Sequence, residues 1–191
     1  SRAPREKLIG VTGTKGKGTT AALLAHILKT AGRRVVLAGN IGEPMLDALP
    51  RLARVNHVIL ELSSFQLQDL RESPHIAIVL DIFPDHLDAH QSLREYHDAK
   101  ANIVRSQKRG DTVFFFGNNP RSCLIARNGP AKKVAVYPKS KGVGKNTEMA
   151  AAVALSLGVP EKTIRKAVQA FRGLPHRMEL VRTINFRPAR H

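Results

Sequence analysis

The sequence predicts an α/β protein built on a doubly wound, mostly parallel sheet that is flanked by helices. Two observations predict this class. Short apolar runs of strand length alternate along the chain with segments whose apolar residues recur at helical spacing. A glycine-rich turn joins the first apolar run to the first helical segment. The 191 residues, 42% of them hydrophobic, are enough for one full core, and no internal repeat is present.

Each element follows from the local apolar spacing and from the residues that interrupt it. Short apolar runs predict strands at 8–12, 34–38, 58–62, 76–80, 112–116 and 133–137. Helical spacing predicts helices at 20–31, 44–52, 92–106, 146–157 and 160–171, with a short helix between the last two strands. Ser92 and Glu95 have the spacing of a capping box, and Pro160 is favoured in a first helical turn. The chain beyond Leu180 has too little pattern to assign.

The chain is strongly basic. Its 31 lysines and arginines against 15 aspartates and glutamates give a formal net charge of +16. Such a charge raises the hypothesis of a nucleic-acid partner. The basic residues are scattered, however, and aromatic residues that could stack on bases are few, with no Trp and two Tyr. A polyanionic nucleotide substrate, or acidic partner domains outside this chain, explains the charge more simply, so nucleic acid is not favoured.

Three features bear on where the protein works. The longest apolar runs, such as 113–116, are far too short to span a membrane. Cys123 is the single cysteine, which excludes a disulfide framework and indicates a reducing cytoplasm. Residues 1–7 lack the apolar stretch of a signal peptide, and we interpret them as the remnant of a linker.

The glycine-rich turn has the composition and position of a phosphate-binding loop. It consists of Gly13, Thr14, Lys15, Gly16, Lys17, Gly18, Thr19 and Thr20. Glycines let backbone N–H groups approach an anion, the following helix N-terminus adds favourable partial charge, and Lys17 can neutralise the outer phosphates. A hydroxyl for Mg²⁺ or phosphate would come from Thr19 or Thr20. The alternative is an ordinary glycine-rich turn. The spacing also differs from that of the usual P-loop, whose first glycine would fall at Val11.

Polar residues follow the third and fourth predicted strands, where the carboxyl ends of parallel strands form ligand sites. Glu61 is placed to hold Mg²⁺ beside the phosphate loop, although a glutamate at a strand end is more often a solvated rim residue. Asp85, His86, Asp88 and His90 follow the fourth strand. Zinc is not favoured there, because a phosphate loop implies a hard metal with oxygen ligands.

Lys100 falls on the apolar stripe of the helix predicted at 92–106, four residues from both Tyr96 and Val104. A buried lysine is costly unless it is paired or chemically modified. The residues alone leave two interpretations open. Lys100 is either a lysine at the edge of the stripe whose ammonium reaches water, or a buried functional lysine.

Five motifs, in this order, resemble those of the Mur ligase family. They are Gly-Thr-x-Gly-Lys at 13–17, Glu-Leu-Ser-Ser-Phe-Gln-Leu at 61–67, Asp-His-Leu-Asp at 85–88, the segment 96–103, and Gly-Leu-Pro-His-Arg-Met-Glu at 173–179. The second and the last resemble the branch that adds D-glutamate, and the resemblance covers residues 8–180. Gly18 instead has the form seen in folylpolyglutamate synthases. Lys145 and Met149 replace the His and the second Asn of a His-Asn-x-x-Asn motif.

The resemblance implies a P-loop NTPase-like central ATP-binding domain at 8–175, with ATP and Mg²⁺ as cofactors. It implies a hinge and the start of a C-terminal domain at 176–191, and a UDP-binding N-terminal domain outside the chain. The implied catalytic residues are Lys17, His86, Lys100 and Arg177; the nucleotide contacts are the loop residues, Asn146 and Arg177; the metal contacts are Thr19, Glu61, His86 and Lys100, if carbamylated; and the substrate contacts are Asn40, Ser63 and His176. From the residues alone, Asn40 could be turn punctuation and Asn146 a helix cap.

The implied activity is ATP-dependent C–N bond formation. The carboxylate of UDP-N-acetylmuramoyl-L-alanine attacks the γ-phosphate, and the amine of D-glutamate then attacks the acyl phosphate, a step of peptidoglycan precursor synthesis. We expect a monomer of the bacterial cytoplasm, and we expect this chain to be inactive without its flanking domains. The alternatives are a folylpolyglutamate synthase-type ligase and a non-catalytic nucleotide- or nucleic-acid-binding fragment.

Overall fold

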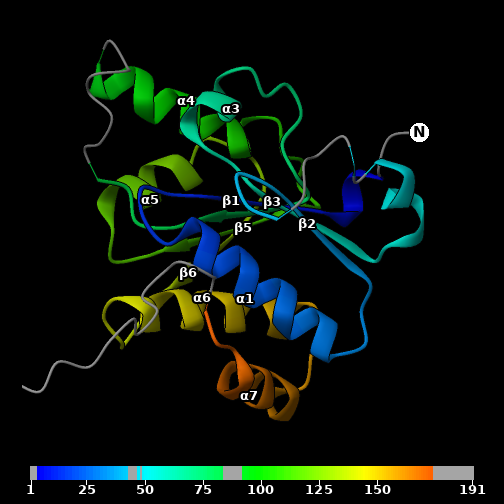
Figure 1. Ribbon diagram of the computed structural model, residues 1–191. Helices are drawn as coiled ribbons and strands as arrows, with labels where there is room; N and C mark the ends of the chain where they lie inside the picture. The colour runs from blue at the N-terminus through cyan, green and yellow to red at the C-terminus, as the bar shows by residue number, and fades with distance from the viewer. Residues whose placement is uncertain (1–3, 43–46, 48, 84–91, 174–191) are drawn as a thin grey trace, which may run out of the picture.

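Six parallel strands form the centre of the molecule, in the order β2-β3-β1-β4-β5-β6 (Figure 1). The computed structural model describes residues 4–42, 47, 49–83 and 92–173. The strands are β1 (Leu8–Thr12), β2 (Val35–Gly39), β3 (His57–Glu61), β4 (Ile76–Val79), β5 (Thr112–Phe116) and β6 (Lys132–Val136). The predicted fold class is confirmed, and the pairing of these strands is entirely parallel.

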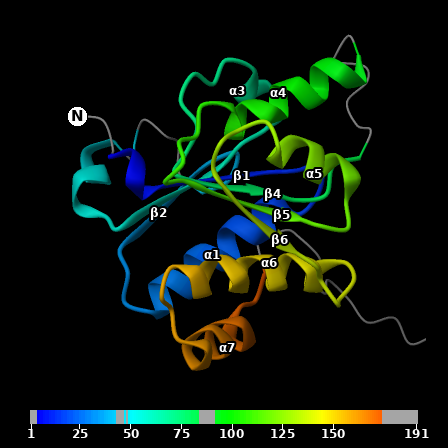
Figure 2. The same ribbon diagram turned by 180° about the vertical axis from the view of Figure 1, so that it is seen from behind.

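Helices cover both faces of the sheet, as the opposite views in Figures 1 and 2 show. One face carries α1 (Lys17–Thr30) and α6 (Val143–Ser156), with α7 (Glu161–Ala170) packed outside them. The other face carries α3 (Ser64–Gln68), α4 (Leu93–Arg105) and α5 (Pro120–Ala126). Two 3₁₀ helices, η1 (Arg5–Lys7) and η2 (Leu49–Arg54), complete the described elements. Among the residues described, no helix is both long and apolar enough to cross a membrane.

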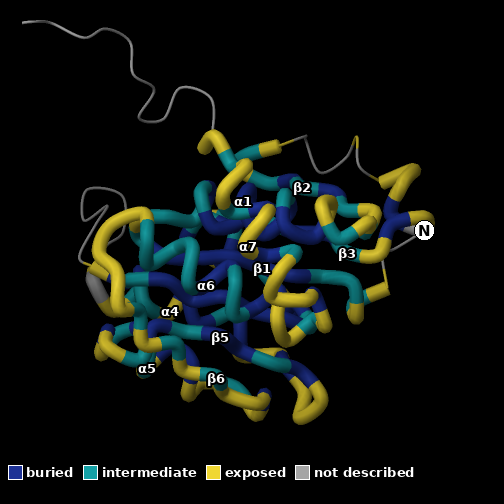
Figure 3. The backbone as a smooth tube through the Cα atoms, turned by 90° about the horizontal axis from the view of Figure 1, so that it is seen from below, coloured by how far each residue is buried: buried dark blue, intermediate teal, exposed yellow. Residues whose placement is uncertain are grey.

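Burial on both faces of the sheet explains why inner strands such as β4 are continuous apolar runs. All residues of β4 are buried, and the middle of the molecule is dark blue in Figure 3. The cluster under α1, α6 and α7 is larger than the one under α3, α4 and α5. Together they hold β1 rigidly between two helical layers, and the candidate functional loop begins where β1 ends.

The predicted strand boundaries agree with the structure to within one residue at each end. The helix predicted at 146–157 begins earlier, at Val143, with Gly142 as its N-cap, so the interpretation of Asn146 as a cap is wrong. Pro160 is the N-cap of α7 and precedes its first turn. Ser92 caps α4 by accepting a hydrogen bond from the Glu95 N–H at 3.1 Å, as predicted. Within the helix predicted at 44–52, Asp47 is α-helical and 49–52 belong to the 3₁₀ helix η2, while 43–46 and 48 lie outside the description.

The segment interpreted as a linker remnant is tied to the sheet through Arg5. Its guanidinium forms an ion pair with the buried Asp111, and its Nε donates to the Ser73 carbonyl at 3.0 Å. His75 Nδ1 lies 2.7 Å from Asp111 Oδ1. Burial raises the pKa of Asp111, but hydrogen bonds from Arg5, the Lys108 N–H and His75 outweigh it and leave that pKa lowered. This network fixes the chain where it enters β1.

Candidate functional site

The loop between β1 and α1 lies at the carboxyl end of the sheet, with its backbone held in place. The Thr14 N–H donates to the Asp81 carbonyl at 2.8 Å, which fastens the loop to the end of the neighbouring strand β4. Gly16 is the N-cap of α1 and has φ +84°, the left-handed region that glycine adopts without strain. α1 therefore begins with backbone N–H groups at the loop, as a phosphate cradle requires.

Thr14 also connects the loop to the opposite helical layer. Its Oγ1 lies 2.9 Å from Tyr96 Oη on α4, and it accepts a hydrogen bond from the Phe83 N–H at 2.9 Å. Tyr96 is fully buried. These bonds hold the Thr14 side chain in place, so Thr14 helps to shape the loop.

Two lysine ammonium groups meet at one loop carbonyl. Lys17 Nζ donates to the Gly13 carbonyl at 3.0 Å and to the Thr14 carbonyl at 3.2 Å, and Lys100 Nζ donates to the Gly13 carbonyl at 3.3 Å. Lys100 is 2% exposed, and its Nζ lies 4.6 Å from the centroid of the Tyr96 ring. The interpretation of Lys100 as a lysine at the edge of the stripe whose ammonium reaches water is therefore wrong. The two cations give the loop a concentrated positive charge.

Glu61 is the last residue of β3 and pairs in register with Val11 of β1. It is 4% exposed, so the interpretation as a solvated rim residue is wrong. Its backbone carbonyl accepts a hydrogen bond from the Asn40 N–H at 3.2 Å, which brings the turn after β2 to the same edge. Asn40 itself is exposed. A carboxylate is thus present one strand away from the loop.

Ser63 caps the short helix α3 through a complete capping box. Its Oγ accepts from the Gln66 N–H at 3.2 Å, and Gln66 Oε1 accepts from the Ser63 N–H at 2.9 Å. The spacing Ser-x-x-Gln was visible in the sequence but was not used to predict this cap. The hydroxyl that the resemblance assigns to a substrate contact therefore also accepts this cap hydrogen bond.

A pocket of about 910 Å³ opens beside the loop. One wall comes from the loop and α1, a second from the chain after β4, a third from the start of α6, and a fourth from the chain after α7. Thr19 lines this pocket, whereas Thr20 is fully buried, so Thr19 is the threonine placed to meet a ligand. The lining residues are Lys15, Gly16, Thr19, Asp81, Phe83, Gly142, Val143, Lys145, Asn146, Phe171, Arg172 and Gly173.

Asn146 projects from the first turn of α6 onto the phosphate loop. A Cβ atom built on Gly16 would lie 2.5 Å from Asn146 Oδ1 and 2.8 Å from its Nδ2. The loop and α6 therefore approach each other closely at this one point, and Gly16 is required there for its lack of a side chain. Met149, which replaces an asparagine of the family motif, is fully buried in the core.

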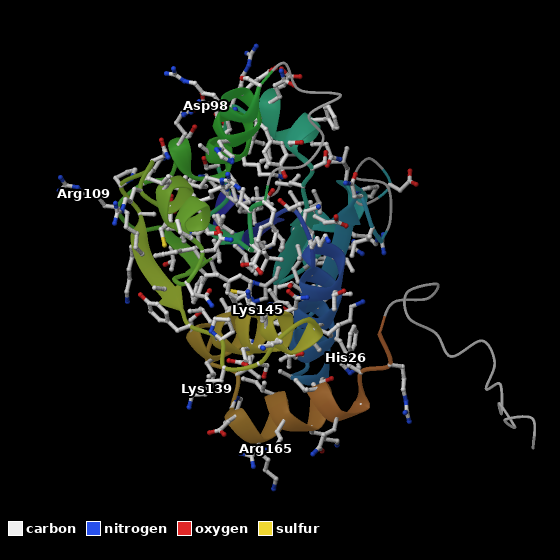
Figure 4. All side chains as sticks on the ribbon, turned by 90° about the vertical axis from the view of Figure 1, so that its left-hand side faces the viewer. His26, Asp98, Arg109, Lys139, Lys145 and Arg165 are labelled. Atoms are coloured by element: carbon white, nitrogen blue, oxygen red, sulfur yellow. The ribbon has the colours of Figure 1, made fainter. Side chains whose placement is uncertain are left out.

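Sequence reasoning missed an ion pair in the pocket wall. Asp81 Oδ2 lies 2.6 Å from Lys145 Nζ, and Lys145 Nζ lies 4.8 Å from the centroid of the Phe116 ring. In Figure 4, Lys145 lies between α6 and the sheet, whereas the labelled side chains of Lys139 and Arg165 point outward. The available signal was an aspartate directly after an apolar strand that neighbours β1.

Several predicted site residues lie outside the described residues, namely Asp85, His86, Asp88, His90, His176 and Arg177. Within the described ranges, no group of three or more His, Cys, Asp or Glu side chains is arranged to hold a metal ion. Of the predicted site residues that are described, the loop, Lys100, Glu61, Thr19 and Asn146 lie at the same edge of the sheet.

A central parallel strand that runs into a glycine-rich loop and a helix N-terminus defines an α/β nucleotide-phosphate-binding domain. The family model described as the Mur ligase middle domain matches residues 11–165. The chain belongs to this family. The resemblance seen in the five sequence motifs is therefore confirmed at the level of the family.

Curated relatives agree with this assignment. The chain is 34% identical to a UDP-N-acetylmuramoylalanine–D-glutamate ligase of Symbiobacterium thermophilum, over 95% of this chain and 48% of that protein. It is 36% identical to the ligase of the same name from Sphingopyxis alaskensis, over 95% of this chain and 45% of that protein. The chain thus spans about half the length of the curated relatives it matches.

Solved structures share the fold. MurF from Acinetobacter baumannii superposes with a TM-score of 0.75 at 18% identity, over 95% of this chain and 49% of that one. The FolC protein of E. coli, in complex with DHPP and ADP, superposes with a TM-score of 0.69 at 20% identity, over 92% and 59% of the two chains. At these identities the likeness concerns the fold alone.

Proposed function

We propose that this chain is the ATP-binding part of a ligase that joins D-glutamate to UDP-N-acetylmuramoyl-L-alanine through an acyl phosphate. The observation that carries the proposal is the loop Gly13–Thr20, which opens with Lys15, Gly16 and Thr19 into a pocket of about 910 Å³. The curated relatives that bear the name of this ligase support the choice of reaction.

The described residues fit a nucleoside triphosphate. The loop offers backbone N–H groups at the start of α1, and Lys15 lines the pocket that continues from it. Lys17 now donates to two loop carbonyls, and we propose that it exchanges them for phosphate oxygens when the nucleotide binds. ATP would supply the phosphoryl group that activates the substrate carboxylate.

The donor set also fits Mg²⁺, which prefers oxygen ligands. Thr19 supplies a hydroxyl at the loop and Glu61 a carboxylate at the end of the neighbouring strand, and we propose that they contact the metal, with His86 at a second metal position. We further propose that Lys100 is carbamylated in the active enzyme. Its ammonium would then become an anion and would give up its hydrogen bond to the Gly13 carbonyl.

The remaining roles concern the substrate. We assign Asn40, Ser63 and His176 to substrate contacts, Asn146 to the adenine, and Arg177 to the transferred phosphoryl group. Residues 8–175 would form the central domain and 176–191 a hinge. A UDP-binding N-terminal domain and a C-terminal domain would complete a monomeric, cytoplasmic enzyme. The half-length coverage of the relatives supports this arrangement.

A second candidate function is a folylpolyglutamate synthase-type ligase, which differs in its acceptor. The observation that favours it is Gly18, because the phosphate loop with this glycine resembles the loop of folylpolyglutamate synthases. Gly18 is buried in the first turn of α1, where it does not line the pocket. The acceptor is chosen by domains outside this chain, so Gly18 bears on the loop alone. Coupling assays with D-glutamate and with glutamyl-folate substrates, once flanking domains are restored, distinguish the two ligases.

Calorimetric titration with ATP, with and without Mg²⁺, tests the nucleotide site. We expect Mg²⁺-dependent binding that is lost in Lys17→Ala and kept in Lys29→Ala. Lys29 is a matched control, because it lies on the same helix but is exposed at its far end. Equal binding by the two variants would show that the loop does not hold the phosphates. Absence of binding by the folded wild-type chain would refute the proposed nucleotide site.

A further inference from the structure

The pocket wall formed by the start of α6 carries a positive group that none of the assigned roles uses. Lys145 lines the pocket together with Lys15, Gly16 and Thr19, yet it comes from α6, about 130 residues further along the chain. It stands where the family motif usually has a histidine. We propose that Lys145 binds the nucleotide phosphates from this wall and that Asp81 is the residue that positions it. This inference rests on the proposed function.

Asp81 is held firmly on the side away from Lys145. Its backbone carbonyl accepts the Thr14 N–H at 2.8 Å, and its Oδ1 lies 3.4 Å from Asn119 Nδ2. Asn119 is the N-cap of α5, where its Oδ1 accepts from the Ser122 N–H at 2.9 Å. Ser122 Oγ in turn donates to the Leu80 carbonyl at 2.6 Å. The carboxylate is therefore a fixed anchor with one oxygen directed to Lys145.

Lys145 is restrained but keeps the capacity to bind a ligand. Its side chain is 21% exposed, its Nζ lies 2.6 Å from Asp81 Oδ2, and the Phe116 ring lies beneath it. An ammonium group has three N–H donors, and within the described part of the chain Asp81 is its one hydrogen-bond acceptor. The other donors remain available to phosphate oxygens in the pocket.

The charge balance of the pocket explains why the pair suits a phosphate site. Lys15 and Lys17 already concentrate positive charge at the loop. A further unpaired ammonium would be repelled before the nucleotide binds, and Asp81 compensates it in that state. A polyphosphate adds negative charge and makes a second, charge-assisted partner for Lys145. A partly buried ion pair alone contributes little stability, so stability is a weak reason for its position in this wall.

The test compares a ligand that has phosphates with one that lacks them. ADP with Mg²⁺ and adenosine are titrated against the wild-type chain, Lys145→Met, Lys145→Arg and Asp81→Asn, by calorimetry for ADP and by ligand-observed NMR for adenosine. Lys139→Met is the matched control, because Lys139 is an exposed lysine four residues before α6 that does not line the pocket.

We expect Lys145→Met to weaken ADP binding about tenfold or more, since a charge-assisted contact is lost. Adenosine binding should be unchanged, and Lys145→Arg should keep most of the ADP affinity. Asp81→Asn should weaken ADP binding in the wild-type background but not in Lys145→Met, because a positioning residue acts through the lysine. If Lys145→Met does not fold, Lys145→Gln replaces it as the neutral variant.

Three outcomes overturn the proposal. Equal ADP affinity in wild type and Lys145→Met would show that the lysine does not touch phosphate, while the proposed function would stand. Tighter ADP binding in Asp81→Asn would show that Asp81 repels the nucleotide and does not position Lys145. A folded wild-type chain that binds neither ligand would refute the proposed nucleotide site and this inference with it.

Discussion

Replacing Gly16 by alanine tests the closest approach in the candidate site. Gly16 has φ +84°, and an L-residue in that left-handed region costs about 1–2 kcal/mol. The new Cβ would also lie 2.5 Å from Asn146 Oδ1, so the asparagine side chain must move. We expect Gly16→Ala to lower the free energy of unfolding by about 2–4 kcal/mol in total. We also expect nucleotide affinity to fall, because the loop and Asn146 separate.

Gly158→Ala is the matched control for the backbone part of this effect. Gly158 has φ +77° after α6, and an added Cβ there would meet no atom within 4 Å. We expect Gly158→Ala to cost only the backbone penalty of about 1–2 kcal/mol and to leave nucleotide binding unchanged. The assay is urea denaturation followed by circular dichroism, with calorimetric titration of Mg-ADP on the same preparations.

A third variant isolates the contact itself. Asn146→Ala removes the three side-chain atoms that lie nearest to the added Cβ, so in that background the added cost of Gly16→Ala should fall towards that of Gly158→Ala. Equal costs for Gly16→Ala and Gly158→Ala in the wild-type background would show that Asn146 does not clash with the new side chain. An unchanged cost of Gly16→Ala after removal of the Asn146 side chain would show the same.

Two further predictions concern the frame that supports the site. The pKa of Asp111 is lowered from its ordinary value of 3.8, so the carboxylate stabilises the fold above that pH and the stabilisation is lost as pH falls through the lowered pKa. Asp111→Asn should therefore unfold at lower urea at neutral pH and show a smaller loss of stability below about pH 3.8; parallel pH profiles would contradict this. Ser122→Ala removes the buried hydrogen bond to the Leu80 carbonyl and should cost about 1–3 kcal/mol, read as a fall in Tm by thermal denaturation. An unchanged Tm would show that the carbonyl finds another partner.

The sequence predicted the inner strands well because strands such as β4 are buried on both faces and therefore read as unbroken apolar runs. The edge strand β6 is largely exposed and has a shorter apolar run. The sequence predicted the start of α6 poorly. The residues before Asn146 are Gly142, Val143, Gly144 and Lys145, and they carry no side chain that caps a helix. The visible polar candidate was Asn146, which lies inside the helix and turns toward Gly16. Its position depends on the packing of α6 against α1, which local pattern does not contain.

Candidate site residues were found where the chemistry is local, as in the phosphate loop and Glu61. Asp81 was missed because its partner, Lys145, lies on a distant helix, and an aspartate after a strand has no distinct pattern of its own. The ion pair of Arg5 could not be predicted for the same reason, since Asp111 lies about a hundred residues away in the chain. The sequence could not predict whether Lys100 is buried, because the apolar stripe of a helix does not show how closely other elements pack against it. In the structure Lys100 is buried.

The placement of β1 has a consequence for how the protein reaches its native state. β1 is the first described strand in the chain, yet its neighbours β3 and β4 end only at Glu61 and Val79. A chain leaving the ribosome cannot complete the hydrogen bonds of β1 until Val79 has been made. Pairings so remote in sequence are also slow to form. The phosphate loop directly follows β1 and therefore takes its final shape only after β3 and β4 have paired with β1. Nucleotide binding during folding would then indicate that both halves of the sheet have formed.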